Sequence, residues 1–192
     1  MDDVTSALAE LERHGLMFVQ DAARPSLTTL LVGKPVKGAW WAHPEAHRIF
    51  GVYGQLEAHP DVLRVKLLDG KVTLVHRQLM PAIAAVGRSC SPWQLDGLSS
   101  AAETLLERVE KEARIATSEK PGKELGERLL VVLGEEHTEK GRHVTVLQSW
   151  DAACRERGIE PLPSVPAARA AIALAALALP TTSGALPRLP WG

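Results

Sequence analysis

The chain has 192 residues, of which 45% are hydrophobic and 23% charged, a composition that suits one compact domain or two small ones. Its net charge of −1 excludes the global excess of Lys and Arg typical of nucleic-acid-binding proteins, so any basic surface must be local. The two cysteines, Cys90 and Cys154, are too few for a disulfide scaffold and lack the spacing of metal ligands, which predicts free thiols in the cytoplasm.

The chain shows no signal for export or for a membrane span. The stretch Met1–Leu11 opens with two aspartates instead of the basic residues and apolar run of a signal peptide. The most apolar stretch, Ala167–Leu179, contains Arg169 and is too short to cross a bilayer. We therefore expect a cytoplasmic protein with no membrane partner, in which Ala167–Leu179 is a buried or docking helix.

Capping residues and apolar spacing predict the first elements. Ser26 is a helix-capping residue type, and Gly15 and Gly33 are the type that ends helices. In chain order, the predicted elements are a helix from Asp2 or Asp3 to about Arg13, a short strand over Leu16–Asp21, a short helix from Ser26 to Gly33 and a helix over Pro44–Ala58.

The strongest local signal is a β-hairpin over Val62–Val75. Apolar and polar residues alternate in its first strand, and Asp69-Gly70 is a favoured two-residue hairpin turn. A hairpin that follows two helices is the arrangement of a winged-helix unit. The first 90 residues are therefore predicted to form such a unit.

The second half repeats this order in a shorter form. It is expected to contain a helix from Ser99 or Ser100 to about Arg114, an irregular stretch over Ile115–Pro121, a helix over Gly122–Leu130, extended segments over Val131–His137 and Arg142–Val146, and a helix over Gln148–Arg157. The predicted fold class is mainly α with short β-hairpins, built as tandem winged-helix-like units. The predicted parts are residues 1–90, residues 98–158, and a Pro-rich connector with an Ala-rich helix and irregular tail over residues 159–192.

Positive charge is concentrated around the hairpin. Between Lys34 and Arg88 there are eight Lys and Arg residues and four acids, an excess of four in a chain of net charge −1. A winged helix places one helix in the major groove and its hairpin beside a phosphate backbone. The predicted DNA-binding residues are Lys34, Lys37, Trp41, His43, His47, Arg48, Arg64, Lys66, Lys71 and Arg77. The alternative is that the hairpin cations form only the solvated face of an amphipathic hairpin.

Two tryptophans and two histidines that could bind a ligand precede the hairpin. The indoles of Trp40 and Trp41 could stack on bases, although such pairs more often anchor a core. His43 and His47 have a spacing that suits a metal, but Pro44 stands where a metalloprotease motif has Glu, and no third ligand matches. The sequence predicts no metal site.

Polar groups gather again in the second half. A histidine beside carboxylates could act as an acid or base, but a polar hairpin tip is the interpretation we favour. This possible second polar site comprises Glu136, His137, Glu139, Arg142 and His143. No phosphate loop, dinucleotide fingerprint or nucleophile elbow is present, so no cofactor is predicted.

Three runs within Leu16–Gly158 resemble the bacterial AlkZ-related proteins, small relatives of the AlkZ/YcaQ DNA glycosylases. The runs are WWAHP at Trp40–Pro44, DGKVT at Asp69–Thr73 and HTEKGRH at His137–His143. The resemblance implies tandem winged-helix folds and, by analogy, duplex DNA, intact or damaged, as the partner, with a role in repair or regulation.

The chain departs from the large glycosylases of this group at their catalytic Gln-x-Gln motif. None of its glutamines has a second Gln two places away, so the catalytic residues remain unknown. Three hypotheses follow: a DNA-binding protein without catalysis, a DNA glycosylase-like enzyme that acts on alkylated or damaged bases, and a protein-interaction module. The first is preferred.

Overall fold

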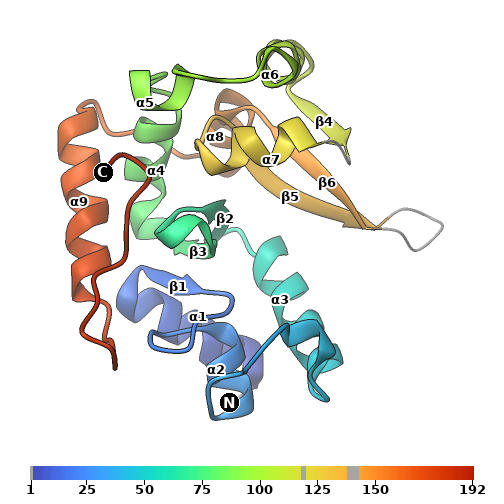
Figure 1. Cartoon of the computed structure of the whole chain (residues 1–192), viewed down its shortest axis with the longest axis vertical. Coiled ribbons are helices and arrows are strands. Elements are labelled where there is room, and N and C mark those ends of the chain that lie inside the picture. Colours follow the sequence, from blue (N-terminus) through green and yellow to red (C-terminus); the bar gives the residue numbers. More distant parts are fainter. Residues whose placement is uncertain (1, 118–119, 138–142) are drawn as a thin grey trace.

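Helices account for about half of the computed structural model, which also contains two antiparallel β-sheets of three strands each (Figure 1). The structure describes residues 2–117, 120–137 and 143–192. The predicted combination of helices with short β-hairpins is confirmed at the level of a mixed α/β fold.

The first half of the chain begins with the elements that its capping residues predict. Asp2 accepts a hydrogen bond from the Thr5 N–H, and Ser26 accepts one from the Thr29 N–H. Gly15 ends the first helix in a left-handed conformation. The elements are α1 (Asp3–His14), β1 (Leu16–Phe18), α2 (Leu27–Val32), α3 (Ala46–Ala58), β2 (Val62–Lys66), β3 (Val72–His76) and α4 (Met80–Gly87).

The predicted hairpin and its turn are confirmed. Asp69 and Gly70 both have positive φ angles, 53° and 67°, and the Lys71 N–H donates to the Leu68 carbonyl over 2.9 Å. These are the angles that a two-residue turn between right-twisted strands requires, and Asp-Gly tolerates them. Strand β1 adds to β3, so the sheet has the order β1-β3-β2.

The second half contains a sheet with the equivalent order, β4-β6-β5. Its elements are α5 (Pro92–Leu95), α6 (Ser100–Glu112), β4 (Arg114–Thr117), α7 (Lys120–Glu127), β5 (Val132–His137), β6 (His143–Gln148) and α8 (Trp150–Arg157). The expectation that Ile115–Pro121 is irregular is wrong, because Arg114–Thr117 pairs with β6. This strand is too short to show an alternating pattern, and its pairing partner lies about 30 residues further along the chain.

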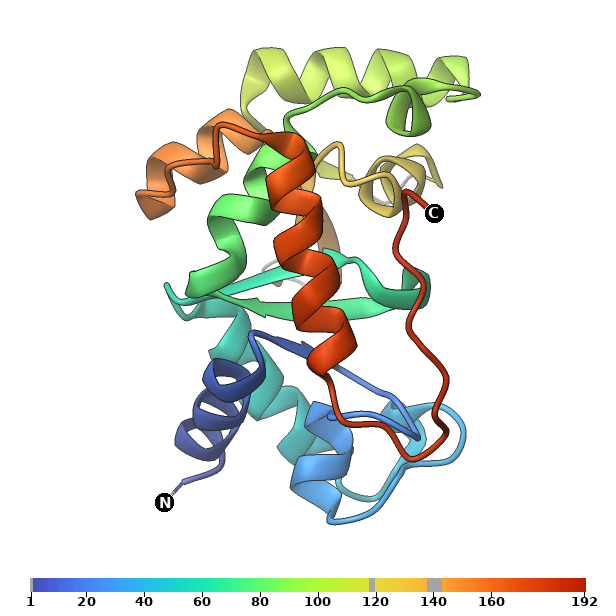
Figure 2. The ribbon, with the colours of Figure 1, turned by 90° about the vertical axis from the view of Figure 1, so that its left-hand side faces the viewer.

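One hydrophobic cluster extends from the first sheet to the C-terminal helix α9 (Val165–Ala178). It includes Leu63 of β2, Ile83 of α4, Trp150 of α8 and Ile172 of α9. Figure 2 shows α9 in front of the first sheet, where it packs along α4. The predicted Ala-rich helix is thus docked on its own chain. Within the described ranges, no helix has the length and apolarity needed to cross a membrane.

The last residues, 180–192, contain no helix or strand and run back along the molecule beside α9 (Figure 2). We call them the C-terminal tail. The tail passes the tip of the β2–β3 hairpin, where the Asp69 N–H donates to the Arg188 carbonyl over 2.9 Å. It ends near α5, where the rings of Trp93 and Trp191 have centroids 5.9 Å apart.

Candidate ligand-binding cleft

The hairpin cations predicted to bind DNA, and Arg48 on α3, are paired with carboxylates of the same chain. Arg77 pairs with Asp61, and Arg48 with both Asp3 and Glu45. The other pairs are Arg64 with Glu57 at 3.0 Å and with Glu135 at 2.8 Å, Lys66 with Glu127 at 3.1 Å, and Lys71 with Asp21 at 2.7 Å. The hairpin therefore presents much less free positive charge than its sequence indicates.

The local excess of four charges is cancelled by acids that lie outside the segment. Five of the eight cations between Lys34 and Arg88 pair with such an acid. The acids are Asp3, Asp21, Glu127, Glu135 and Asp151. Counting charge within a window missed these partners, because the tertiary fold supplies them.

The remaining predicted DNA-binding residues lie on the loop before α3 and on its first turn. Trp41 has 65% of its surface exposed, whereas its neighbour Trp40 is buried. Lys34 and Lys37 are exposed and make no ion pair with any residue that the structure describes. His43 and His47 belong to no group of three or more possible metal ligands within the described part of the chain.

The possible second polar site cannot be assembled from the described part of the chain. Glu139 and Arg142 lie outside the described residues. Glu136, His137 and His143 belong to strands β5 and β6, where the backbone register pairs His137 with His143. This site stays a prediction.

A cleft of about 780 Å³ includes three of the predicted residues, Trp41, Arg64 and Lys71, in its lining. Apolar side chains form most of its lining, and a few polar groups join them, as in many small-ligand sites. Its walls come from the loop after β1, the loop before α3, α3 itself, the hairpin and β5. The lining residues are Val19, Gln20, Asp21, Ala22, Val36, Trp40, Trp41, Phe50, Tyr53, Arg64, Gly70, Lys71, Val72 and Glu135.

Aromatic rings form one wall of the cleft. The Trp40 ring lies 4.4 Å from the Phe50 ring and 6.0 Å from the Trp41 ring, measured between centroids. Phe50 and Tyr53 share this wall because residues three apart lie on one face of a helix. Trp40 anchors the wall in the core, while Trp41 and Phe50 keep exposed surface, 65% and 40%. Trp40 thus has the core position that the sequence favoured, whereas Trp41 remains exposed.

A charged cluster adjoins the aromatic wall. The Arg64 side chain is only 11% exposed and lies between Glu57 and Glu135, with its guanidinium 5.7 Å from the Tyr53 ring centre. Burial by itself would lower the pKa of Arg64, but Tyr53, Glu57 and Glu135 together raise it, so the guanidinium stays charged. Burial raises the pKa of Tyr53, so its hydroxyl stays protonated.

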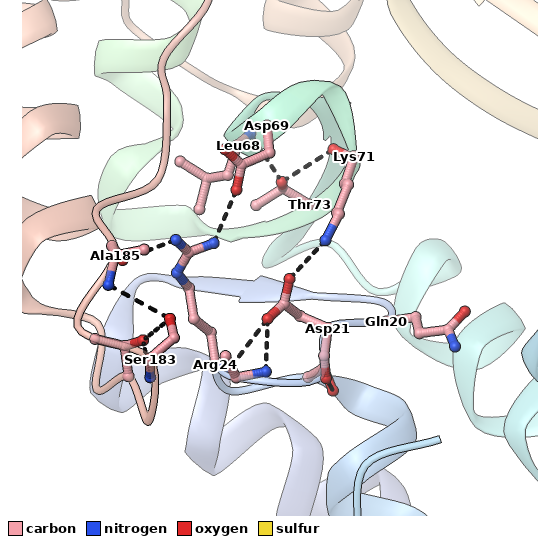
Figure 3. Close-up of polar contacts among 12 residues, drawn as sticks. Gln20, Asp21, Arg24, Leu68, Asp69, Lys71, Thr73, Ser183 and Ala185 are labelled. Carbon is pink, nitrogen blue, oxygen red and sulfur yellow. Dashed lines mark hydrogen bonds and ion pairs between the residues drawn. The ribbon is translucent and has the colours of Figure 1, made fainter. Parts of the chain in front are cut away.

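The cleft lining also includes an ionised carboxylate, Asp21, in the loop after β1 (Figure 3). Asp21 accepts hydrogen bonds from the N–H groups of Ala23 and Arg24 and from the Lys71 ammonium. Burial would raise the pKa of Asp21, but the Lys71 ammonium and the Ala23 N–H outweigh it and lower the pKa. Lys71 therefore ties the hairpin to this loop at the edge of the cleft.

Gln20 fixes the loop that bears the two exposed lysines. Its side-chain amide donates to the Val36 carbonyl over 3.2 Å and to the Gly38 carbonyl over 2.7 Å. Because these two carbonyls flank Lys37, the amide holds the backbone beside the cleft in a defined position. Lys34 and Lys37 thus flank Val36, which lines the cleft.

Sequence reasoning missed most of the cleft lining, including five polar or aromatic side chains, those of Gln20, Asp21, Phe50, Tyr53 and Glu135. The spacing of Phe50 and Tyr53 is a signal that could have identified both as one aromatic face. Asp21 is a residue type that commonly accepts a hydrogen bond from the N–H two residues later, here that of Ala23. The Asx turn was therefore also a usable signal. No local signal marks Gln20 or Glu135, because their partners are far away in the sequence.

The cleft has the chemistry to bind a planar ring. Its aromatic wall offers stacking, and its polar groups include a fixed cation, an ionised carboxylate and an amide. No protein-family model, curated protein or solved structure matches the chain. The similarity to AlkZ-related proteins stays a prediction.

Proposed function

We propose that this protein binds nucleic acid and holds an unstacked base in the aromatic cleft. The order of elements in the first half, with a sheet of order β1-β3-β2, supports a winged-helix unit. The second sheet, with its shorter insertions, supports a second unit of the same kind. Winged-helix units commonly bind nucleic acid, and the AlkZ-related resemblance favours DNA.

The observation that carries the proposal is the exposure of Trp41 and Phe50 on the wall of the cleft. Exposure of large aromatic side chains to water is unfavourable, so their exposure beside a cavity indicates a ligand surface. Stacking of a base on an aromatic side chain stabilises binding by about 1–3 kcal/mol. The free cations Lys34 and Lys37 beside this wall would meet the flanking phosphates.

The paired hairpin cations favour this mode over insertion of the hairpin beside an intact duplex. Each of Arg64, Lys66, Lys71 and Arg77 would have to leave a carboxylate before it met a phosphate. Release of such pairs opposes the gain from phosphate contacts. Single strands and duplexes with an unpaired base are therefore the expected ligands.

The test is equilibrium binding of fluorescently labelled single-stranded DNA, intact duplex and duplex with one unpaired base to the full chain. Trp41→Ala should weaken binding of the single strand by about tenfold, within the range that base stacking contributes. Leu174→Ala, a control at an exposed apolar residue of α9, should bind like wild type. Equal binding by Trp41→Ala and wild type, or no binding by wild type, would refute the proposal.

A base-excising hydrolase is the second candidate, and one observation favours it. The ionised Asp21 carboxylate lines the same cleft and could stabilise positive charge that develops on a sugar when its base leaves. If the chain is such an enzyme, it should release modified bases from alkylated DNA, and Asp21→Asn should abolish the release. Failure of wild type across a panel of lesions would exclude this candidate.

A further inference from the structure

The C-terminal tail is hydrogen-bonded to the tip of the β2–β3 hairpin. The Asp69 N–H donates to the Arg188 carbonyl over 2.9 Å, and the Arg188 N–H donates to Asp69 Oδ1 over 3.0 Å. Asp69 and Arg188 thus join the hairpin tip to the tail through two hydrogen bonds. The hairpin tip and the tail form a single surface element (Figure 2).

Further contacts hold the tail on both sides of this joint. Arg24 donates to Asp69 Oδ2 over 2.8 Å and to the Ala185 carbonyl over 2.9 Å (Figure 3). Near the C-terminus, the Arg169 guanidinium lies 5.6 Å from the centre of the Trp191 ring. Because the tail is anchored along its length, its side chains project from a defined backbone.

Arg188 differs from the other cations at this tip. The Arg24 side chain is 7% exposed and the Lys71 side chain 49%, and each pairs with an aspartate below 3 Å. The Arg188 side chain is 89% exposed, and its Nε lies 3.7 Å from Asp69, whose two oxygens already accept closer hydrogen bonds. Arg188 therefore directs its charge toward solvent.

We propose that the tail completes the nucleic-acid-binding surface, with Arg188 as a phosphate contact beside the cleft. This inference rests on the proposed function. Arg188 lines a small pocket together with Gly70, and Gly70 also lines the aromatic cleft. A strand with its base in the cleft would thus have a phosphate-binding guanidinium next to it. The anchored backbone limits the entropy lost on binding.

The test is the salt dependence of single-stranded DNA binding by the full-length chain. Loss of one phosphate contact should reduce the slope of log K against log salt concentration by about 0.7. Arg188→Gln should show this reduction and bind about fivefold more weakly at 0.1 M salt, the weakening that this slope predicts. Arg188→Lys should keep the slope, and Arg155→Gln, which removes an exposed charge from α8, should match wild type.

The readouts separate this inference from the proposed function. If Trp41→Ala weakens binding while Arg188→Gln leaves the slope unchanged, the cleft binds nucleic acid and the inference about the tail is wrong. If wild type binds no nucleic acid, the proposed function fails and the inference falls with it. An equal loss of slope in Arg155→Gln would also overturn the inference, because the effect would then come from net charge.

Discussion

The two sheets have equivalent strand orders, but among the described residues the first sheet and its insertions supply nearly all of the aromatic cleft, and the second sheet contributes Glu135. Residues 19–61 separate β1 from β2 and supply α2, the short 3-10 helix Trp40–Ala42 and α3. Residues 118–131 separate β4 from β5 and supply α7. The cleft is built largely from the longer insertion. Repetition of a sheet topology therefore does not repeat the cleft, because most of the cleft lining belongs to the connecting segments.

The two halves also meet through a charged contact that neither sheet contains by itself. Arg64 on β2 pairs with Glu57 of the first half and with Glu135 on β5 of the second. This contact makes the second sheet part of the cleft wall. The following predictions test how far the two halves depend on each other, from the largest expected effect to the smallest.

Arg64→Met should lower the free energy of unfolding by about 3 kcal/mol, because it removes the cation from between two partly buried carboxylates. Urea denaturation measures the loss. Lys66→Met, whose more exposed pair with Glu127 also joins the halves, should cost under about 1 kcal/mol. Equal losses in the two variants would show that the burial of Arg64 does not determine how much its ion pairs stabilise the fold.

Gly87→Ala should lower the free energy of unfolding by about 2 kcal/mol, since the added methyl would lie 2.1 Å from the Trp150 ring. The buried ring cannot easily move, because its Nε1 donates to the Leu129 carbonyl over 2.7 Å. Gly126→Ala meets the flexible end of Leu133 and should cost less. Thermal unfolding of both variants decides whether the contact between α4 and α8 is more rigid than the contact between α7 and β5.

The free lysines and the paired hairpin cations should differ in nucleic-acid binding. Lys34→Gln with Lys37→Gln should reduce the salt slope for single-stranded DNA by about 1.4, or 0.7 for each phosphate contact. Lys66→Gln with Arg77→Gln should reduce it little, since these side chains are already paired. A larger effect of the second pair would support the hairpin as the binding element.

Asp21→Asn should make stability less sensitive to acid. The lowered pKa of Asp21 means that its carboxylate stabilises the fold above the unfolded pKa of about 3.9. This contribution is lost as the pH falls through the lower folded pKa. Urea denaturation between about pH 5 and pH 2 should therefore show a shallower decline for Asp21→Asn, and also for Lys71→Met. A decline as steep as in wild type would contradict the assigned pairing.

Features that depend on neighbouring residues were predictable from the sequence. Each of these features depends on contacts between residues only a few positions apart in the sequence. They are the Asp2 and Ser26 caps, the Gly15 and Gly33 helix ends and the Asp69-Gly70 turn. Their geometry follows from backbone preferences and short-range hydrogen bonds. Hence the sequence predicted α1, α2, α3 and the hairpin of the first half close to their observed bounds.

Only the tertiary structure determined which charges are free and which loops meet. Arg64 and Lys37 are both cations of the same basic segment, and the sequence does not distinguish them. Arg64 is nevertheless buried between Glu57 and Glu135, while Lys37 stays exposed. Likewise, Arg188 reaches the hairpin tip only because the chain turns back after α9. Ion pairing depends on distance in space, and pairs so distant in sequence leave no local pattern. The sequence by itself determined the elements that carry local signals, whereas packing determined the strand β4 and the cleft.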